Sequence, residues 1–396
     1  MEIKLNTKEN NWLAVLLISI GSFVIINTEF MPVGLLSEIS TYYNISTSQA
    51  GLLITMPGIS AAISAPTLLL LSRGWDRRLI IVSMLSIVVL SNVLTYEANY
   101  FGWALFARLL LGISIGGFWS FSIPYGIKLV ENKNRNRATA IITAGISAGT
   151  VIGVPLGTYL GVEIGWKNTF LINGIFSGCI LILQLMKIPS QKSDIIVNFN
   201  KVVEIVMVPA IAQRLISGLL YGSAHFTAFT YYEPLILSGG GMSNDVLPEF
   251  MFIYGISGLL GTLIAERLIS LFSARWTLFI SIFLVSFSAI SLITVSSGFF
   301  TISVITFFWG TAFGLMPVSI NVWLVEASGK NYEIVSTINV TAFQIAIALG
   351  SIIGGIASAY LGLRAPFILA IVMGFLCMRA ISFNLKIRRK EFISYD

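Results

Sequence analysis

The amino-acid sequence predicts an all-α membrane protein with twelve transmembrane helices in two six-helix halves. The first observation is composition, because 56% of the 396 residues are hydrophobic and only 11% are charged. A soluble domain carries about a quarter charged residues. The second observation is that the apolar residues form long runs instead of the regular stripes of a soluble fold. The third is that the longest polar interruption, residues 189–204, divides the chain into nearly equal parts.

Twelve apolar runs in the sequence are long enough to cross a bilayer, because a spanning helix needs about 20 mainly apolar residues. The fourth and tenth runs are interrupted by prolines and glycines. An even number of spans places both termini on one side of the membrane. The predicted spans are residues 12–36, 48–71, 79–97, 101–129, 138–162, 167–187, 206–232, 247–269, 276–297, 299–323, 334–361 and 365–385.

The lysines and arginines predict the orientation of these spans. With the N-terminus taken as cytoplasmic, Lys167 and Arg364 lie on the outer side, and Arg108 and Arg379 fall within spans. The other twenty of the 24 basic residues lie on the cytoplasmic side, which satisfies the positive-inside rule. We therefore expect both termini to be cytoplasmic. Because the charges sit at the ends of apolar runs and form no basic patch, no nucleic-acid partner is expected.

An internal repeat supports the division into halves. The stretch Gly149–Gly161 matches Gly350–Gly362 at a constant offset of 201 residues. We expect an N-terminal six-helix half (1–188), a cytoplasmic central loop (189–205) and a C-terminal six-helix half (206–396). Parallel repeats of this kind are typical of transporters whose substrate site lies between the halves, near the membrane midplane.

Two ionisable residues within spans are the leading functional candidates, since such side chains are costly in a membrane. Counted at 1.5 Å per residue, Glu29 lies about 24 Å above the cytoplasmic edge, and Arg108 lies about 10 Å deep from the outside. The two depths agree, so the pair is a candidate for proton coupling, with a carboxyl that binds and releases a proton as the pair approaches or separates. The alternatives are a static structural ion pair, or a Glu29 exposed at the outer interface.

The end of the seventh span offers a candidate substrate surface. His225, Tyr232 and Glu233 fall at positions i, i+7 and i+8 of a helix and share one face. An imidazole, a phenol and a carboxyl together suit a polyhydroxyl or heteroaromatic ligand. The alternative is an interfacial aromatic belt with Glu233 outside the membrane. Asn27 is a further candidate for substrate binding. It stands two residues before Glu29 and therefore does not share the helix face of Glu29.

The fifth span carries small residues at four-residue spacing. Gly149, Gly153, Gly157 and the neighbouring Pro155 form part of this track. Small residues at i and i+4 let two helices approach closely, and proline adds a kink. The track is a candidate for a sliding or sealing contact between the halves, and close static packing is the alternative.

Several function classes are excluded by missing motifs. The sequence has no phosphate-binding glycine loop with lysine, no dinucleotide-binding fingerprint and no cluster of metal ligands, and His225 is its one histidine. We therefore expect no catalytic residues, no metal and no cofactor, so transport takes its energy from an ion gradient or from the gradient of the substrate. The expected partners are a small-molecule substrate, protons and the lipid bilayer, and the expected state is a monomer.

Four segments resemble motifs of the major facilitator superfamily, specifically of its bacterial twelve-span drug:proton antiporter group. Asn27–Leu36 is similar to the acidic first-helix motif of the sugar-efflux and purine-nucleoside-efflux branches, which implies that Glu29 carries the coupled proton. Arg108–Gly116 resembles the fourth-helix motif whose arginine is linked to proton transfer. Gly149–Gly157 resembles the antiporter signature, with Gly-Val-Pro in place of Gly-Pro. Asp76, Arg77 and Arg78 resemble a truncated form of the loop between the second and third helices, which implies a conformational role.

The resemblance leaves the substrate open. Ala224–Ala228 and Tyr232–Pro234 look more like sugar efflux, whereas Gly116–Trp119 and Trp309–Gly310 look more like nucleoside efflux. Together with the acid Glu29 inside a span, the resemblance implies a proton-coupled antiporter that exports a sugar, nucleoside or drug-like compound across the bacterial inner membrane by alternating access. A gradient-driven facilitator or importer of a small polar solute with the same fold is the alternative.

Overall fold

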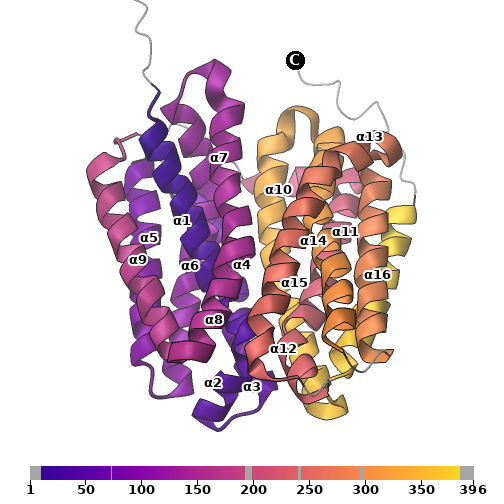
Figure 1. Ribbon diagram of the computed structural model, residues 1–396. Helices are drawn as coiled ribbons and strands as arrows, with labels where there is room; N and C mark the ends of the chain where they lie inside the picture. The colour runs from indigo at the N-terminus through magenta and orange to yellow at the C-terminus, as the bar shows by residue number, and fades with distance from the viewer. Residues whose placement is uncertain (1–9, 73, 192–198, 240–241, 295–297, 384–396) are drawn as a thin grey trace, which may run out of the picture.

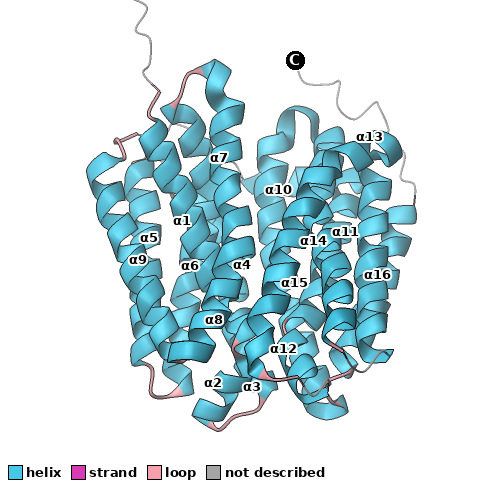
Figure 2. Cartoon of the chain, in the orientation of Figure 1, coloured by secondary structure: helices cyan, strands magenta, loops and turns pink. Residues whose placement is uncertain are grey.

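The computed structural model describes residues 10–72, 74–191, 199–239, 242–294 and 298–383, and these form helices joined by short loops (Figure 2). Among the described residues, ten helical segments are long and apolar enough to cross a membrane by length and composition. One of them, α13 (Leu247–Thr294), covers two predicted spans. The seventh predicted span corresponds to α11 (Pro209–Phe229), which is not among the ten. Each predicted span thus contains helix in its described residues, and residues 295–297 and 384–385 of the predicted spans lie outside the described part of the chain.

The first part of the chain follows the predicted spans closely. The fifth span is divided into α7 and α8, which a π-helical turn joins. The elements in chain order are α1 (Trp12–Phe30), η1 (Met31–Gly34), α2 (Leu36–Tyr43), α3 (Thr47–Ala50), α4 (Leu52–Leu71), α5 (Arg77–Glu97), α6 (Phe101–Gly126), η2 (Ile127–Leu129), η3 (Asn132–Asn134), α7 (Arg135–Ala148), η4 (Gly149–Gly153), α8 (Val154–Ile164) and α9 (Trp166–Lys187).

The second part adds one helix where a loop was predicted. The short α10 begins inside the predicted loop 189–205 and ends one residue beyond it. Its Val202, Ile205 and Val206 recur at helical spacing. The elements are α10 (Phe199–Val206), α11 (Pro209–Phe229), α12 (Tyr232–Pro234), η5 (Leu235–Gly239), η6 (Asn244–Val246), α13 (Leu247–Thr294), α14 (Phe299–Ser328), η7 (Gly329–Asn331), α15 (Tyr332–Leu361) and α16 (Ala365–Ser382).

A sharp bend divides α13 into two membrane-spanning parts. Ser273 has φ 73° and ψ 158°, far from helical values, in the middle of the 48-residue segment. A residue other than glycine rarely adopts positive φ, so Ser273 marks the connection between the eighth and ninth predicted spans. The two spans are therefore separate helices that meet at Ser273.

The helices form two groups that lie side by side (Figure 1). The first group contains α1 to α9, and the second contains α10 to α16. The groups meet along α4 with α15 and along α8 with α13. Glycines permit this close approach: a Cβ atom on Gly58 of α4 would come within 2.9 Å of the backbone oxygen of Gln344, and one on Gly255 of α13 within 2.6 Å of Val151 Cα.

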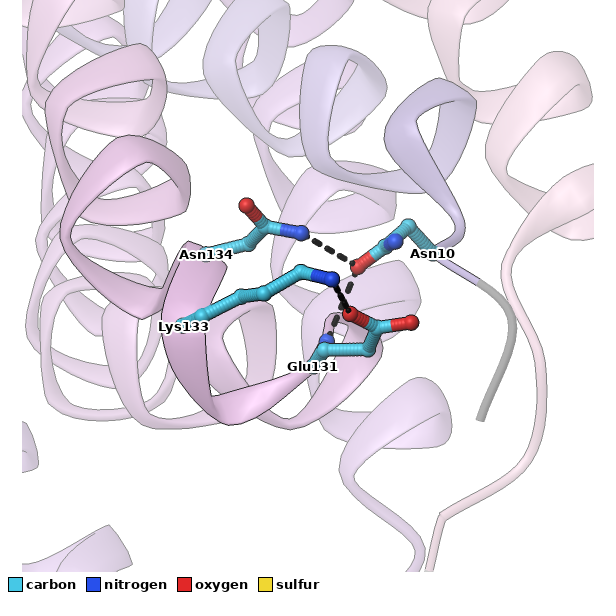
Figure 3. Close-up of polar contacts among 4 residues, drawn as sticks. All are labelled: Asn10, Glu131, Lys133 and Asn134. Atoms are coloured by element: carbon cyan, nitrogen blue, oxygen red, sulfur yellow. Dashed lines mark hydrogen bonds and ion pairs between the residues drawn. The ribbon is translucent and has the colours of Figure 1, made fainter. Parts of the chain in front are cut away.

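The start of the first helix is tied to the loop that precedes α7. Figure 3 shows Asn10 Oδ1 accepting hydrogen bonds from the Glu131 backbone N–H (2.9 Å) and from Asn134 Nδ2 (3.0 Å). Beside it, Lys133 Nζ lies 2.8 Å from Glu131 Oε2. The Lys133 side chain is 78% exposed, and exposed ion pairs contribute little to stability. The hydrogen bonds of the Asn10 side chain, together with that from the Asn11 backbone N–H to Leu129 O at 3.0 Å, make this connection.

Candidate functional site

Glu29 is a buried acid at the boundary between the two groups of helices. It lies near the end of α1 and is 3% exposed. Its Oε1 accepts a hydrogen bond from Nε2 of Gln344, at 3.3 Å, and Gln344 belongs to α15 of the other group. The exposed interfacial position that the sequence left open is therefore not observed. The contact connects the charge of one side chain to the relative position of the two groups.

Arg108 lies beside Glu29 but binds backbone oxygens. The fully buried guanidinium donates from Nε to Leu53 O at 2.9 Å, from Nη1 to Thr28 O at 2.8 Å and from Nη2 to Glu29 O at 2.8 Å. Among the described residues no ion pair joins Arg108 to the Glu29 carboxylate. The sequence correctly placed the two residues at one depth, whereas the direct pairing that it suggested is replaced by three carbonyl contacts.

Asn27 lies in a buried amide cluster on the other side of α1. Its Nδ2 donates to Asn173 Oδ1 at 3.0 Å, and Asn173 Nδ2 donates to Thr28 Oγ1 at 2.6 Å. Asn92 Nδ2 also donates to Thr28 Oγ1, at 3.3 Å. Sequence reasoning missed Asn92, although an asparagine inside a predicted span was an available signal. Asn27 Oδ1 is buried and has no hydrogen-bond partner among the described residues.

His225 lies inside an aromatic cluster of the second group. Its Nδ1 is 3.1 Å from Trp309 Nε1, and its Nε2 is 3.2 Å from the Tyr254 hydroxyl. An indole N–H can only donate, so Nδ1 is the acceptor and the proton of the neutral imidazole is on Nε2, which donates to Tyr254. The Phe313 and Phe229 rings stack on the imidazole at centroid distances of 4.1 and 5.0 Å.

The three residues predicted to share one helix face do not lie on one continuous helix. α11 ends at Phe229, and Tyr231 (φ −107°, ψ 16°) interrupts the helix before α12. The continuous helix assumed for residues 225–233 is therefore wrong. The Tyr232 hydroxyl bonds Thr306 Oγ1 at 2.6 Å, and its ring contacts Trp309, which donates to His225.

Glu233 instead reaches the first group of helices. Its two carboxylate oxygens accept from the backbone N–H of Ser37, at 3.3 and 3.2 Å. Ser37 lies in the first turn of α2, where backbone N–H groups lack helical partners and favour negative charge. Glu233 is 2% exposed and is therefore buried within the protein; whether it lies inside or outside the membrane stays a prediction.

The glycine track of the fifth span packs on α1. A Cβ atom on Gly149 would meet Ile26 at 2.8 Å, one on Gly153 would meet Asn27 at 3.0 Å, and one on Gly157 would meet Met31 at 3.2 Å. These glycines therefore hold α1 close to its neighbour within the first group. The opposite side of the same π-helical turn, at Thr150 and Val151, touches Gly255 of α13 in the second group.

The π-helical turn itself precedes Pro155. Because proline lacks an N–H, the carbonyl of Val151 has no donor four residues later. A π-helical turn of five residues, Gly149–Gly153, accommodates this break.

The loop between α4 and α5 binds the start of the central segment. Asp76 Oδ1 accepts from the backbone N–H of Arg78 at 2.9 Å and of Gln191 at 2.8 Å, and Arg77 N–H donates to Gln191 O at 2.9 Å. Burial raises the pKa of Asp76, but the hydrogen bonds from Ser190, Gln191 and Arg78 outweigh burial and hold that pKa below its ordinary value. The Arg77 guanidinium lies 4.5 Å from the centre of the Phe121 ring.

Comparison with known proteins identifies the family. The chain matches the Major Facilitator Superfamily over residues 18–332 and again over residues 241–392. It is 28% identical over 378 residues to the purine ribonucleoside efflux pump NepI of Salmonella paratyphi B (strain ATCC BAA-1250 / SPB7), covering 96% of this chain and 94% of the relative. It is 27% identical over 360 residues to the protein of that name from Salmonella enteritidis PT4 (strain P125109), covering 91% and 90%.

Two solved structures share the fold. A bacterial homologue of the human lysosomal transporter Spinster, in an inward-facing and unoccupied conformation, superposes with a TM-score of 0.74 and 15% identity, covering 95% of this chain and 98% of the other. The human organic anion transporter MFSD10 (TETRAN) gives 0.67 and 14%, covering 93% and 98%. The prediction of an all-helical membrane fold is thus confirmed. The chain belongs to the Major Facilitator Superfamily and is a multi-pass secondary transporter, not an enzyme.

Proposed function

We propose that this transporter is a proton-coupled efflux antiporter of the bacterial inner membrane, and that Glu29 binds the coupled proton. The observation that carries the proposal is the position of this carboxylate. It is buried in the first group of helices, yet its hydrogen bond comes from Gln344 of the second. A proton on Glu29 changes the contact between the groups, so protonation and alternating access become one process.

Contacts on the outer side support an inward-facing state for this conformation. The Glu233 carboxylate bonds the Ser37 N–H, and the Phe30 and Phe226 rings stack across the boundary at 5.6 Å. In the proposed cycle the N-terminal half (1–188) and the C-terminal half (206–396) move as units about segment 189–205. Protonation of Glu29 from outside favours release of substrate outward, and its deprotonation toward the cytoplasm accompanies binding of the next substrate.

We propose a nucleoside as the first substrate class to test, because the pumps similar to this chain are named for purine ribonucleosides. The buried Asn27 Oδ1, which has no hydrogen-bond partner among the described residues, provides an acceptor for a heteroaromatic base. Both His225 nitrogens are bonded and its ring faces stack on Phe313 and Phe229, so we assign His225 to the packing of the second group. The Glu233 carboxylate is occupied by Ser37 of the first group, so we assign Glu233 to the closed outer contact. The Tyr232 hydroxyl is occupied by Thr306 within the second group.

Reconstituted vesicles that contain a pH-sensitive dye test the proposal. Adenosine and guanosine are compared with arabinose and the cationic drug ethidium, each added with and without an imposed pH gradient. We expect a nucleoside to release protons from wild-type vesicles, and we expect Glu29→Gln to abolish this release. Glu163→Gln, which alters an exposed acid at the end of α8, is the matched control.

Two results overturn the proposal. Proton-driven transport that persists in Glu29→Gln removes the coupling role from this residue. Substrate movement that ignores the imposed pH gradient in the wild type assigns the chain to the gradient-driven facilitators.

A further inference from the structure

The carbonyls that bind Arg108 stand in a fixed relation to two prolines. In an α-helix the carbonyl of residue i accepts from the N–H of residue i+4, and proline has no N–H. Pro32 stands four residues after Thr28, and Pro57 stands four residues after Leu53. The two prolines therefore leave without helical donors the oxygens that Arg108 binds through Nη1 and Nε.

The third carbonyl follows the same rule in a different helical register. After Phe30 the chain continues as the 3₁₀ helix Met31–Gly34, and in that geometry a carbonyl pairs with the residue three positions later. For Glu29 that residue is again Pro32, and its carbonyl accepts from Arg108 Nη2 at 2.8 Å. One guanidinium therefore satisfies three oxygens that two prolines release in two separate segments.

Arginine is the side chain that fits this arrangement. Its planar guanidinium offers five N–H groups in a fixed fork, whereas lysine offers a single nitrogen. A buried cation is costly unless hydrogen-bond acceptors surround it, and the released carbonyls supply them. The three carbonyls and the guanidinium compensate each other, because buried carbonyls without hydrogen-bond donors are unfavourable and so is a buried cation without a carboxylate.

We infer that Pro32 and Pro57 are positioning residues for the proton site, since they release the carbonyls that hold the Arg108 charge beside Glu29. The inference rests on the proposed function for the role of Glu29, while the hydrogen-bond geometry is independent of it. Arg108 of α6 is the charged group that acts on the Glu29 carboxyl. α15 contributes the neutral Gln344 amide.

The first experiment changes one released carbonyl. In Pro57→Ala the new N–H competes with Arg108 for the Leu53 carbonyl, so the guanidinium is held less tightly and stabilises the Glu29 carboxylate less. The pH midpoint of adenosine counterflow in vesicles is expected to rise by about 0.5–1 unit. Pro66→Ala is the matched control on α4, because its carbonyl partner four residues earlier, Ala62, is not bound by Arg108. Equal midpoints in the two variants overturn the positioning role.

The second experiment measures thermal unfolding of purified protein in detergent without substrate. Arg108→Met leaves the three carbonyls unpaired, and its melting temperature is expected to fall. Adding Pro32→Ala and Pro57→Ala to this variant supplies two new helical N–H groups for the three carbonyls, so the melting temperature recovers in part while the dependence of transport on proton binding stays lost. A triple variant as unstable as Arg108→Met overturns the inference. Recovery of stability in the triple variant, together with a wild-type chain that shows no antiport for any substrate, leaves the inference standing and overturns the proposed function.

Discussion

Two buried glutamates each reach across the boundary between the groups of helices, in opposite directions. Glu29 belongs to the first group and accepts from the side chain of Gln344 in the second. Glu233 belongs to the second group and accepts from the backbone of Ser37 in the first. Both are at least 97% buried, yet their surroundings differ in flexibility and in charge.

The difference lies in what each carboxylate can tolerate. The Glu29 partner is a flexible amide, and the Arg108 guanidinium lies beside the same residue, so this acid can keep or lose its charge as the groups separate. The Glu233 partner is a fixed N–H in the first turn of α2, and no cation pairs with Glu233 in the described part of the chain. Under the proposed function, we expect the first acid to exchange protons and the second to form a contact that is either made or broken.

The largest expected effect comes from making the same substitution, glutamate to glutamine, at each of the two acids. Glu29→Gln is expected to abolish substrate-dependent proton release in vesicles, because an amide has no proton to exchange at neutral pH. Glu233→Gln keeps an oxygen that accepts from Ser37, so proton release is expected to persist. Both are measured with a pH-sensitive dye at matched protein density.

Equal loss of proton release in the two variants contradicts the comparison. Thermal unfolding of each variant in detergent serves as the control, because it identifies a protein that fails to fold.

The next largest effect removes only the partner of Glu233. Ser37→Pro deletes one N–H in the first turn of α2, where proline is tolerated. Loss of a hydrogen bond to a charged group is expected to cost about 2 kcal/mol and to shift the balance about 30-fold toward the state open to the outside. The measurement is labelling of Phe30→Cys by an impermeant thiol reagent in a background without Cys179 and Cys377. Ser37→Ala, which keeps the N–H, is the control, and equal labelling in both variants contradicts the prediction.

A smaller effect concerns the helix that carries Glu29. In Gly153→Ala the new methyl group would lie 3.0 Å from the Asn27 side chain, and such overpacking is expected to cost about 1–2 kcal/mol. Thermal unfolding measures it. Gly178→Ala on α9, where a Cβ atom meets nothing within 4 Å, is the control and is expected to be neutral or stabilising. A Gly153→Ala protein as stable as the control means that α1 is not tightly held.

The smallest effect concerns Asp76 at the start of α5. Because the folded protein holds the pKa of this carboxyl below its ordinary value, its contribution to stability is present above that ordinary pKa and is lost as pH falls through the folded value. Asp76→Asn is expected to cost about 0.5 kcal/mol at pH 7. The difference in melting temperature between this variant and the wild type should begin to shrink as pH falls below about 4 and should disappear below the folded pKa. A difference that is independent of pH assigns the effect to geometry alone.

The fold could be predicted from the sequence because membrane solvation acts on whole segments. Apolar runs of about 20 residues have few alternatives to a spanning helix, and each predicted span contains helix in its described residues. The depth of Glu29 and Arg108 was also predictable, since the rise of a helix is constant. The division of α13 needed only the polar residues around Ser273.

The partners of the site residues were less predictable, because they depend on which side chains face each other between helices. Arg108 was expected to meet a carboxylate, but helix ends and prolines supplied closer oxygens. The pairing of His225 with Trp309 joins residues 84 positions apart, and no periodicity within one helix reveals it. Tyr231 breaks α11 without a glycine, so the assumption of a continuous face failed.

The π-helical turn Gly149–Gly153 also determines which way the glycines of the fifth span face around the helix axis. On a regular α-helix each residue turns the chain by about 100°, so a motif repeated every four residues drifts around the axis by about 40° at each step. Five glycines from Gly145 to Gly161 would drift by about 160°, yet all five face the first span, at contacts from Ser19 to Leu35. A π-helical turn holds more residues than an α-helical turn. Each residue in it therefore rotates the chain by less, and the drift of the glycines around the axis is reduced. Deleting one residue from it would rotate Gly145 off α1 while leaving Gly157 in place.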